Sequence, residues 1–174
     1  GEIKSNSYRI QVIDLPVLRR LQIKIEPPAY SRIEPYLLDE NIGDVTALKG
    51  GVVHISGEAN KPLAAGTIQF STGKKITMPG RDRRMNADFK IERDEIYSIL
   101  LTDLQGNKSI NPIEYHLKST PDQYPFIRIV SPGRDIDLGE DMLIPLAIEA
   151  QDDYGISKIE LAYQVVGKES EQID

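Results

Sequence analysis

The sequence predicts an all-β protein built from two successive β-sandwich units, and three observations support this. Apolar residues recur at every second position, as in Leu21, Ile23 and Ile25, which is typical of strands with one buried face. No window of about 11 residues or more has a convincing helical period. Finally, the segment Asp44–Phe70 superposes without a gap on Asp135–Leu161.

This internal repeat has an offset of 91 residues, which exceeds the roughly 20–50 residues of a solenoid repeat and suits an array of small domains. The superposition places apolar residues on apolar residues: Val45 on Ile136, Val53 on Ile144, Ile55 on Leu146, Ile68 on Ile159 and Phe70 on Leu161. The chain therefore resembles a section of a string of similar domains.

Short strands separated by turn signals follow one another along the whole chain, and this spacing favours a sandwich. The turn signals are Gly50-Gly51, Asn60-Lys61-Pro62, Thr72-Gly73, Pro79-Gly80, Gln105-Gly106-Asn107 and Ser131-Pro132-Gly133. The predicted strands are 7–14, 19–26, 44–48, 51–58, 65–71, 74–78, 85–92, 96–103, 108–118, 126–131, 135–138, 142–151 and 156–166. The one helical candidate is a single short turn in Pro35–Asn41.

The composition is that of a soluble globular protein, with 40% hydrophobic residues and a net charge of −6. An acidic surface argues against nucleic acid or anionic lipid as the main partner. Because cysteine is absent, the chain has neither disulfides nor thiolate chemistry, which is compatible with the cytosol and equally with an extracytoplasmic location.

The stretch Tyr97–Ser109 resembles the penultimate hairpin of bacterial immunoglobulin-like domains, where a Tyr precedes Asp-x-x-Gly-Asn. This resemblance implies tandem immunoglobulin-like sandwiches, one complete and one partial. It also implies that Tyr97 is a tyrosine corner, with its ring in the core and its hydroxyl on the backbone. The alternative is a Tyr that begins a strand and has no special bond.

Two proline-containing linkers, Leu15-Pro16-Val17 and Ser119–Pro125, divide the chain, and proline makes such joints semi-rigid. We expect a complete sandwich over 16–120 and a partial one over 121–174. Lys4–Val12 matches Ser109–Leu117 at an offset of 105, so 1–15 is expected to be the last strand of a preceding repeat. Strand-swapped self-association between neighbouring chains is then expected, because incomplete sheets leave edges open.

Three stretches resemble a family of large, uncharacterised bacterial membrane-anchored proteins: Ile25–Tyr30, Gly57–Leu63 and, most specifically, Asp152–Tyr163. The resemblance covers most of 16–166. It implies that the chain belongs to an extracytoplasmic region, periplasmic or envelope-associated, whose parent is anchored in the inner membrane by segments outside this chain. It supplies no catalytic residues.

Candidate sites for metal, nucleic acid or catalysis each have a simpler structural interpretation. Asp152-Asp153, with nearby acidic residues, has the ligand type for calcium, but a turn in which Asp side chains accept backbone N–H groups is favoured. Arg81-Asp82-Arg83-Arg84 is interpreted as a solvated hairpin tip. His54 and His116 lie on different predicted strands, which argues against zinc. No cofactor, metal or catalytic residue is predicted.

The insert Ala29–Ile42 has no counterpart in the second unit, and it carries the apolar side chains of a possible interaction surface: Tyr30, Ile33, Tyr36, Leu37 and Leu38. We expect it to pack over an open end of the first sandwich, because an apolar loop in water is unfavourable.

The leading hypothesis for the function of the chain is a non-enzymatic spacer whose partners are other domains of the parent or envelope proteins. The alternative is an accessory domain that binds glycan or peptide through this insert; a hydrolase is a third and weaker hypothesis.

Overall fold

The structure is a computed structural model that describes residues 13–137, 139–141, 143–164 and 171–173. The described residues form two compact units: unit 1 runs to Pro28 and then from Glu34 to Thr120, and unit 2 contains Ala29–Ile33 and the chain from Pro121 onward. Apart from one 3-10 turn, η1 (Ala29–Ser31), the regular elements are strands, which confirms the predicted all-β class. Among the described residues, no helix is long and apolar enough to cross a membrane.

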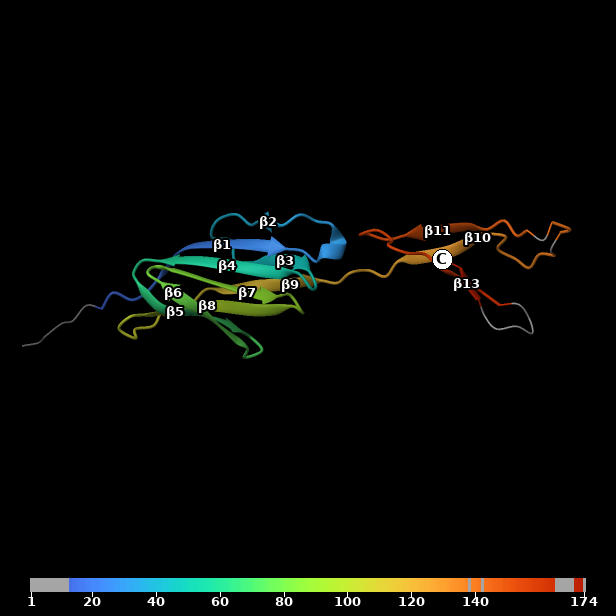
Figure 1. Cartoon of the computed structure of the whole chain (residues 1–174). Helices are drawn as coiled ribbons and strands as arrows, with labels where there is room; N and C mark the ends of the chain where they lie inside the picture. The colour runs from blue at the N-terminus through green and yellow to red at the C-terminus, as the bar shows by residue number, and fades with distance from the viewer. Residues whose placement is uncertain (1–12, 138, 142, 165–170, 174) are drawn as a thin grey trace, which may run out of the picture. The chain divides into compact units, whose positions relative to one another are not determined.

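Unit 1 is a nine-stranded, curled sheet in its described residues, with the strand order β2-β1-β4-β7-β6-β5-β8-β9-β3 (Figure 1). All neighbours pair antiparallel except β3 and β9, which are parallel. The strands are β1 (Leu18–Glu26), β2 (Tyr36–Leu37), β3 (Val45–Leu48), β4 (Val52–Ala59), β5 (Leu63–Phe70), β6 (Lys75–Arg81), β7 (Arg84–Lys90), β8 (Glu95–Asp103) and β9 (Glu114–Thr120).

The sheet curls at β6, where Pro79-Gly80 bends the strand from one neighbour to the other. Up to Pro79 the strand pairs with β5, and at Gly80 and Arg81 it pairs with β7. A Cβ on Gly80 would lie 2.4 Å from the carbonyl oxygen of Leu63, so only glycine permits this approach. The prediction of a turn at Pro79-Gly80 was therefore wrong, because proline and glycine also mark bends within a strand, and the turn follows at Asp82-Arg83.

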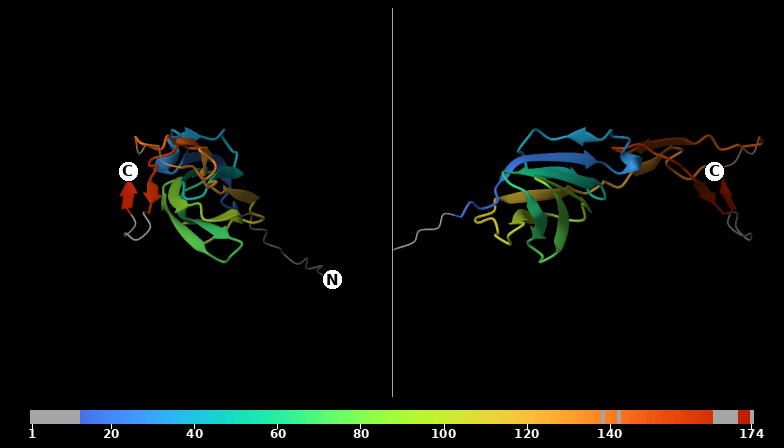
Figure 2. Two further views of the ribbon diagram at one scale, coloured as in Figure 1. Left: turned by 90° about the vertical axis from the view of Figure 1, so that its right-hand side faces the viewer. Right: turned by 60° about the vertical axis from the view of Figure 1, so that its left-hand side comes forward.

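The core lies between the two halves of the curled sheet, with β1, β4 and β7 on one side and β5, β8 and β9 on the other (Figure 2). Alternation places one face of each strand inside, as the sequence period predicted. The core residues are Leu21, Ile23, Ile25, Val45, Ala47, Val53, Ile55, Ala59, Leu63, Ile68, Phe70, Met78, Met85, Phe89, Ile91, Tyr97, Ile99, Leu101 and Leu117.

Tyr97 on β8 anchors one end of this core and is only 1% exposed. Its ring lies 5.4 to 6.1 Å, centroid to centroid, from those of Phe70, Phe89 and Tyr115. Its hydroxyl donates a 2.5 Å hydrogen bond to the carbonyl oxygen of Gly43, just before β3. Burial raises the pKa of Tyr97 above its ordinary value, so the hydroxyl remains a donor. The predicted backbone bond of Tyr97 is thus confirmed.

The segment between β1 and β3 extends the β1 edge and does not cover an open end of unit 1. Tyr36–Leu37 pairs with β1, the Leu38 N–H donates to the Ile23 carbonyl (2.9 Å), and the Asn41 N–H donates to the Leu21 carbonyl (2.8 Å). Tyr36–Leu37 is therefore extended within the segment Pro35–Asn41, for which a single short turn was predicted, because the open edge of β1 offers backbone partners. A turn does follow at Glu40-Asn41, where the Ile42 N–H donates to the Asp39 carbonyl (3.2 Å). Leu38 packs against the core as expected for this insert, whereas Leu37 is 66% exposed.

Unit 2 contains two strand pairs, β10 (Phe126–Ser131) with β11 (Ala147–Gln151), and β12 (Leu161–Tyr163) with β13 (Glu171–Ile173). The pair β10–β11 is antiparallel, like β1–β4, and the repeat offset places Ile148 on Gly57. The predicted strands 142–151 and 156–166 are shorter in the structure, and no strand is described within 135–137. The predicted strand 7–14 lies outside the described residues except for its last two positions.

The apolar side chains of unit 2 are much more exposed than their counterparts in unit 1. Val53 and Ile55 are 0% and 1% exposed, whereas the equivalent Ile144 and Leu146 are 48% and 41% exposed. In unit 1 these positions belong to one core cluster with residues of β5 and β8, whereas the described part of unit 2 forms only the strand pairs β10–β11 and β12–β13.

We predict that replacing Tyr97 by Phe lowers the free energy of unfolding by about 1–3 kcal/mol, because the buried Gly43 carbonyl loses its donor. Urea denaturation followed by far-UV circular dichroism measures the change. Tyr124→Phe is the control, since Tyr124 is 98% exposed. An equal effect of both substitutions would contradict a specific role for the Tyr97 hydroxyl.

We also predict that the chain self-associates through unit 2, since exposed apolar strands with open edges favour pairing. Ile129→Lys on β10 should shift the chain toward monomer in light scattering at matched concentrations. Leu104→Lys, at an exposed turn position of unit 1, should leave the association unchanged. A strictly monomeric unmodified chain would refute the prediction.

Candidate functional site

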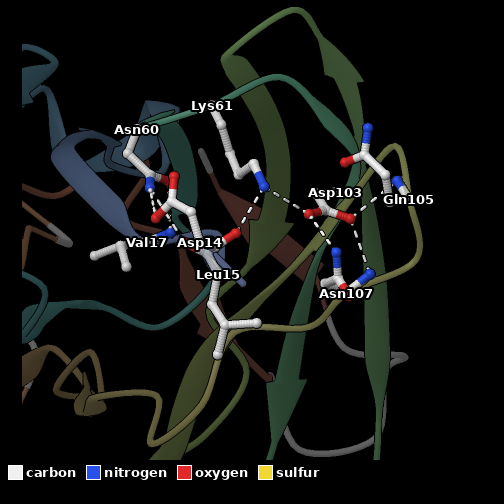
Figure 3. A network of polar contacts seen from close by, with 8 residues as sticks. All are labelled: Asp14, Leu15, Val17, Asn60, Lys61, Asp103, Gln105 and Asn107. Carbon is white, nitrogen blue, oxygen red and sulfur yellow. Dashed lines mark hydrogen bonds and ion pairs between the residues drawn. The ribbon is translucent and has the colours of Figure 1, made fainter. Parts of the chain in front are cut away.

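The linker that leads into unit 1 is held by a polar cluster that we call the linker clamp, formed by Asn60, Lys61, Asp103 and Asn107 (Figure 3). Asn60 directly follows β4 and forms two hydrogen bonds with the backbone of Val17. The Val17 N–H donates to the Asn60 side-chain oxygen (2.8 Å), and the Asn60 N–H donates to the Val17 carbonyl (3.0 Å). The Asn60 amide also donates to the Leu15 carbonyl (3.1 Å).

Lys61 connects this linker to the end of β8, in the other half of the curled sheet. Its ammonium group donates to the backbone carbonyl of Asp14 (2.7 Å) and to a carboxylate oxygen of Asp103 at the end of β8 (2.9 Å). The Asp103 side chain is fully buried and that of Lys61 is 22% exposed. Since removing one partner of a buried ion pair leaves an uncompensated charge, this contact fixes the linker to the fold.

Asp103 is satisfied by the turn that follows it as well as by Lys61. The backbone N–H groups of Gln105 and Asn107 donate to one carboxylate oxygen (2.9 and 2.8 Å), and the Asn107 amide donates to the other (3.0 Å). These bonds, the Asn107 amide first among them, hold the pKa of Asp103 well below its ordinary value despite the desolvation that raises it. The carboxylate is therefore ionised at neutral pH and available to Lys61.

The sequence explains both halves of the linker clamp locally. Asn60-Lys61-Pro62 and Gln105-Gly106-Asn107 are turn signals, and Gly106 adopts the left-handed conformation (φ 84°) that closes the second turn. The Lys61–Asp103 pair was not predicted, because it joins turns 42 residues apart. The sequence did contain a signal for this pair: Lys61 lies in one predicted turn, and Asp103, of opposite charge, lies directly before the other.

The residues of the predicted interaction surface are divided between the two units, and its role stays a prediction. Tyr36 and Leu37 lie on β2, and Leu38 follows them against the core of unit 1. Tyr30 and Ile33 belong to unit 2, where the Tyr30 ring packs edge-on against Tyr154 with centroids 6.2 Å apart.

His54 on β4 forms a second polar cluster, on the outer face of unit 1. Its Nδ1 lies 2.8 Å from a carboxylate oxygen of Asp88 on β7, and its Nε2 lies 3.1 Å from one of Glu26 on β1. Asp88 and Glu26 raise the pKa of His54 above its ordinary value, with Asp88 contributing most. The predicted separation of His54 from His116 holds, since His116 lies on β9.

The acidic segment of unit 2 forms the turn that was favoured over a calcium site. The Tyr154 N–H donates to a carboxylate oxygen of Asp152 (3.1 Å), and Gly155 follows with a left-handed φ of 98°. Within the part of the chain that the structure describes, no group of three or more His, Cys, Asp or Glu residues is placed to hold a metal ion.

No family model, curated protein or solved structure that was compared with the chain matches it.

We predict a pH-dependent loss of stability from Asp103→Asn. Because the folded-state pKa lies below the unfolded value of 3.8, the ionised carboxylate stabilises the fold fully above about pH 5, and this contribution is lost as the pH falls below 3.8. The variant should therefore have a lower urea midpoint than the unmodified protein at pH 7, with a smaller gap at pH 3. Asp39→Asn, at an exposed position, should change neither midpoint; a constant gap would contradict the ionic contribution.

The opposite pH dependence is expected for His54. Its pKa is raised on folding, so its contribution is present below the unfolded value of 6.5 and is lost as the pH rises through the folded pKa. The free energy of unfolding of the unmodified protein should exceed that of His54→Gln by up to about 1 kcal/mol at pH 5.5, and the two should be equal near pH 8.5. Lys24, directly opposite on β1, opposes the gain. Ser56→Ala, on the same face, should show no such pH dependence.

Proposed function

We propose that this chain is a non-enzymatic structural module, a rigid spacer that sets the orientation of the segments joined to it. The observation that carries the proposal is the linker clamp. A flexible tether needs no bonds to the domain that follows it, whereas here Asp14, Leu15 and Val17 are bonded to Asn60 and Lys61. A linker fixed at successive positions transmits orientation from one domain to the next.

The connectivity of unit 1 supports an immunoglobulin-like sandwich. In such sandwiches the first, second and fifth strands share one sheet, and the third, sixth and seventh share the other. If the edge strands β2 and β3 are set aside, β1, β4 and β7 are the first, second and fifth strands and β5, β8 and β9 are the third, sixth and seventh, with the switching strand β6 as the fourth. Tyr97 lies near the start of the sixth strand, where that fold has its conserved tyrosine, but its hydroxyl bonds to the backbone of Gly43, 54 residues upstream, and not to the nearby residues of a tyrosine corner.

The strand pair β10–β11 of unit 2 supports a tandem array. The antiparallel pair β10–β11 repeats β1–β4, and the sequence repeat extends to β12, where Leu161 corresponds to Phe70 of β5. On this proposal 121–174 supplies the first strands of a second sandwich, and the partners of its exposed apolar positions are further strands of the same kind.

The cellular setting of the proposal rests on the family resemblance of Asp152–Tyr163 and the other two stretches. It is an extracytoplasmic position in the bacterial envelope, in a parent protein anchored in the inner membrane. The partners are then other domains of that parent or envelope proteins, and the chain's negative charge is consistent with the proposal that nucleic acid is not among them.

We predict that Asn60→Ala releases the linker without unfolding unit 1. The substitution removes the side-chain bonds to the Leu15 carbonyl and the Val17 N–H but keeps the backbone bond from Asn60 to the Val17 carbonyl. The ¹⁵N order parameter of Leu15 should therefore fall from about 0.85, typical of rigid backbone, to below about 0.6, and that of Val17 should fall less. Asn86→Ala, at an exposed position of β7, should leave both unchanged. If Leu15 is already mobile in the unmodified protein, or remains rigid in Asn60→Ala, the spacer proposal loses its main support.

A further inference from the structure

The outer face of unit 1 carries a groove of about 660 Å³ over β1, β4, β7 and the end of β6. Strand register places its lining side chains in two rows across the sheet. One row runs from Arg20 through Glu58 to Arg84, which is itself paired with Arg81. The neighbouring row consists of Gln22, Ser56 and Asn86.

The two arginines at the end of the first row are an unusual pair. Arg81 and Arg84 are directly opposite each other on β6 and β7, and like charges in such a pair destabilise a hairpin. Arg20 has Glu40 as an ion-pair partner at 3.2 Å, but within the described residues neither Arg81 nor Arg84 has a side-chain partner. The register therefore places two arginines directly opposite each other at one end of the groove, with Glu58 on the other side of Arg84.

The hairpin that carries these arginines is fixed in place. The carbonyl of Arg83 accepts the Ala59 N–H (2.8 Å), and the carbonyl of Asp82 accepts the Leu63 N–H (2.8 Å). The cluster is the exposed hairpin tip that was predicted, and its backbone is bonded to the connection between β4 and β5. Because the tip is held by the fold, the backbone positions from which the side chains of Arg81 and Arg84 extend are fixed.

We propose that this groove binds an anionic saccharide, one carboxylate of which lies between Arg81 and Arg84 while sugar hydroxyls bond to Ser56 and Asn86. A guanidinium fork matches a carboxylate in charge and geometry. The amide and hydroxyl of the second row both donate and accept hydrogen bonds, as sugar hydroxyls require.

Two observations favour a saccharide over other anions. The groove lies on a sheet face where the backbone groups of β1, β4 and β7 are engaged in ladders, so an acidic peptide cannot bind there by strand addition. The chain also has a net charge of −6, which repels polyanions such as nucleic acid and leaves a local site for one carboxylate.

The test is a titration of the ¹⁵N-labelled full chain with digalacturonic acid, followed by two-dimensional NMR. We expect saturable shifts of the backbone amides around Ser56, Arg84 and Asn86. Arg81→Gln and Arg84→Gln should each weaken binding at least tenfold, as expected for loss of a charged hydrogen bond. The matched control is Arg83→Gln, which removes the same charge from the same hairpin outside the groove and should change affinity less than twofold.

Arg84→Lys provides a second variant that keeps the charge and loses the fork, and it should also bind more weakly. Galactobiose, the neutral analogue, should not bind. The proposal is overturned if digalacturonic acid causes no shifts in the groove, or if Arg83→Gln weakens binding as much as Arg81→Gln. It is also overturned if inorganic phosphate or tetraglutamate binds as tightly as the saccharide, since the groove would then be selective for charge alone.

Discussion

The buried carboxylate of Asp103 is the interaction on which the organisation of unit 1 depends. It ends β8, shapes the turn to Asn107, and holds the ammonium group of Lys61, which in turn holds the linker at Asp14. A buried charge is costly unless every acceptor position is satisfied, and here two backbone N–H groups, an amide and an ammonium group share the two oxygens. This requirement ties together parts of the chain that are far apart in sequence.

The strands themselves could be predicted from the sequence because their signals are local. The alternation of Val53 and Ile55 with polar neighbours defines β4, and the Tyr before Asp-x-x-Gly-Asn defines β8 and its turn. Two local predictions were wrong for a related reason. Pro79-Gly80 is a bend between two pairings of one strand, and Tyr36–Leu37, within the predicted turn Pro35–Asn41, pairs with the free edge of β1. In both cases a tertiary neighbour decided the backbone conformation.

The polar clusters could not be predicted, because each depends on strand register. His54 contacts Asp88 and Glu26 because β4 lies between β1 and β7 in a particular alignment, and a slip of β4 by one residue would turn His54 to the other face of the sheet, away from both carboxylates. The repeat makes the same point for apolar residues. Val53 and Ile144 occupy equivalent positions in the sequence, yet one is buried and the other exposed, because burial is set by the strands that surround each of them.

The parallel pairing of β3 with β9 has a mechanical consequence. The chain enters unit 1 before β1 and leaves it at Thr120, the last residue of β9, while β3 runs alongside with Val45 opposite Leu117 and Leu48 opposite Thr120. When tension is applied to the two ends of the unit, parallel strands are pulled past each other along their length. The hydrogen bonds between them are then loaded in shear, all at the same time. An antiparallel hairpin that is pulled apart from one end loses its bonds one after another, so the parallel ladder resists extension more than a hairpin of equal length.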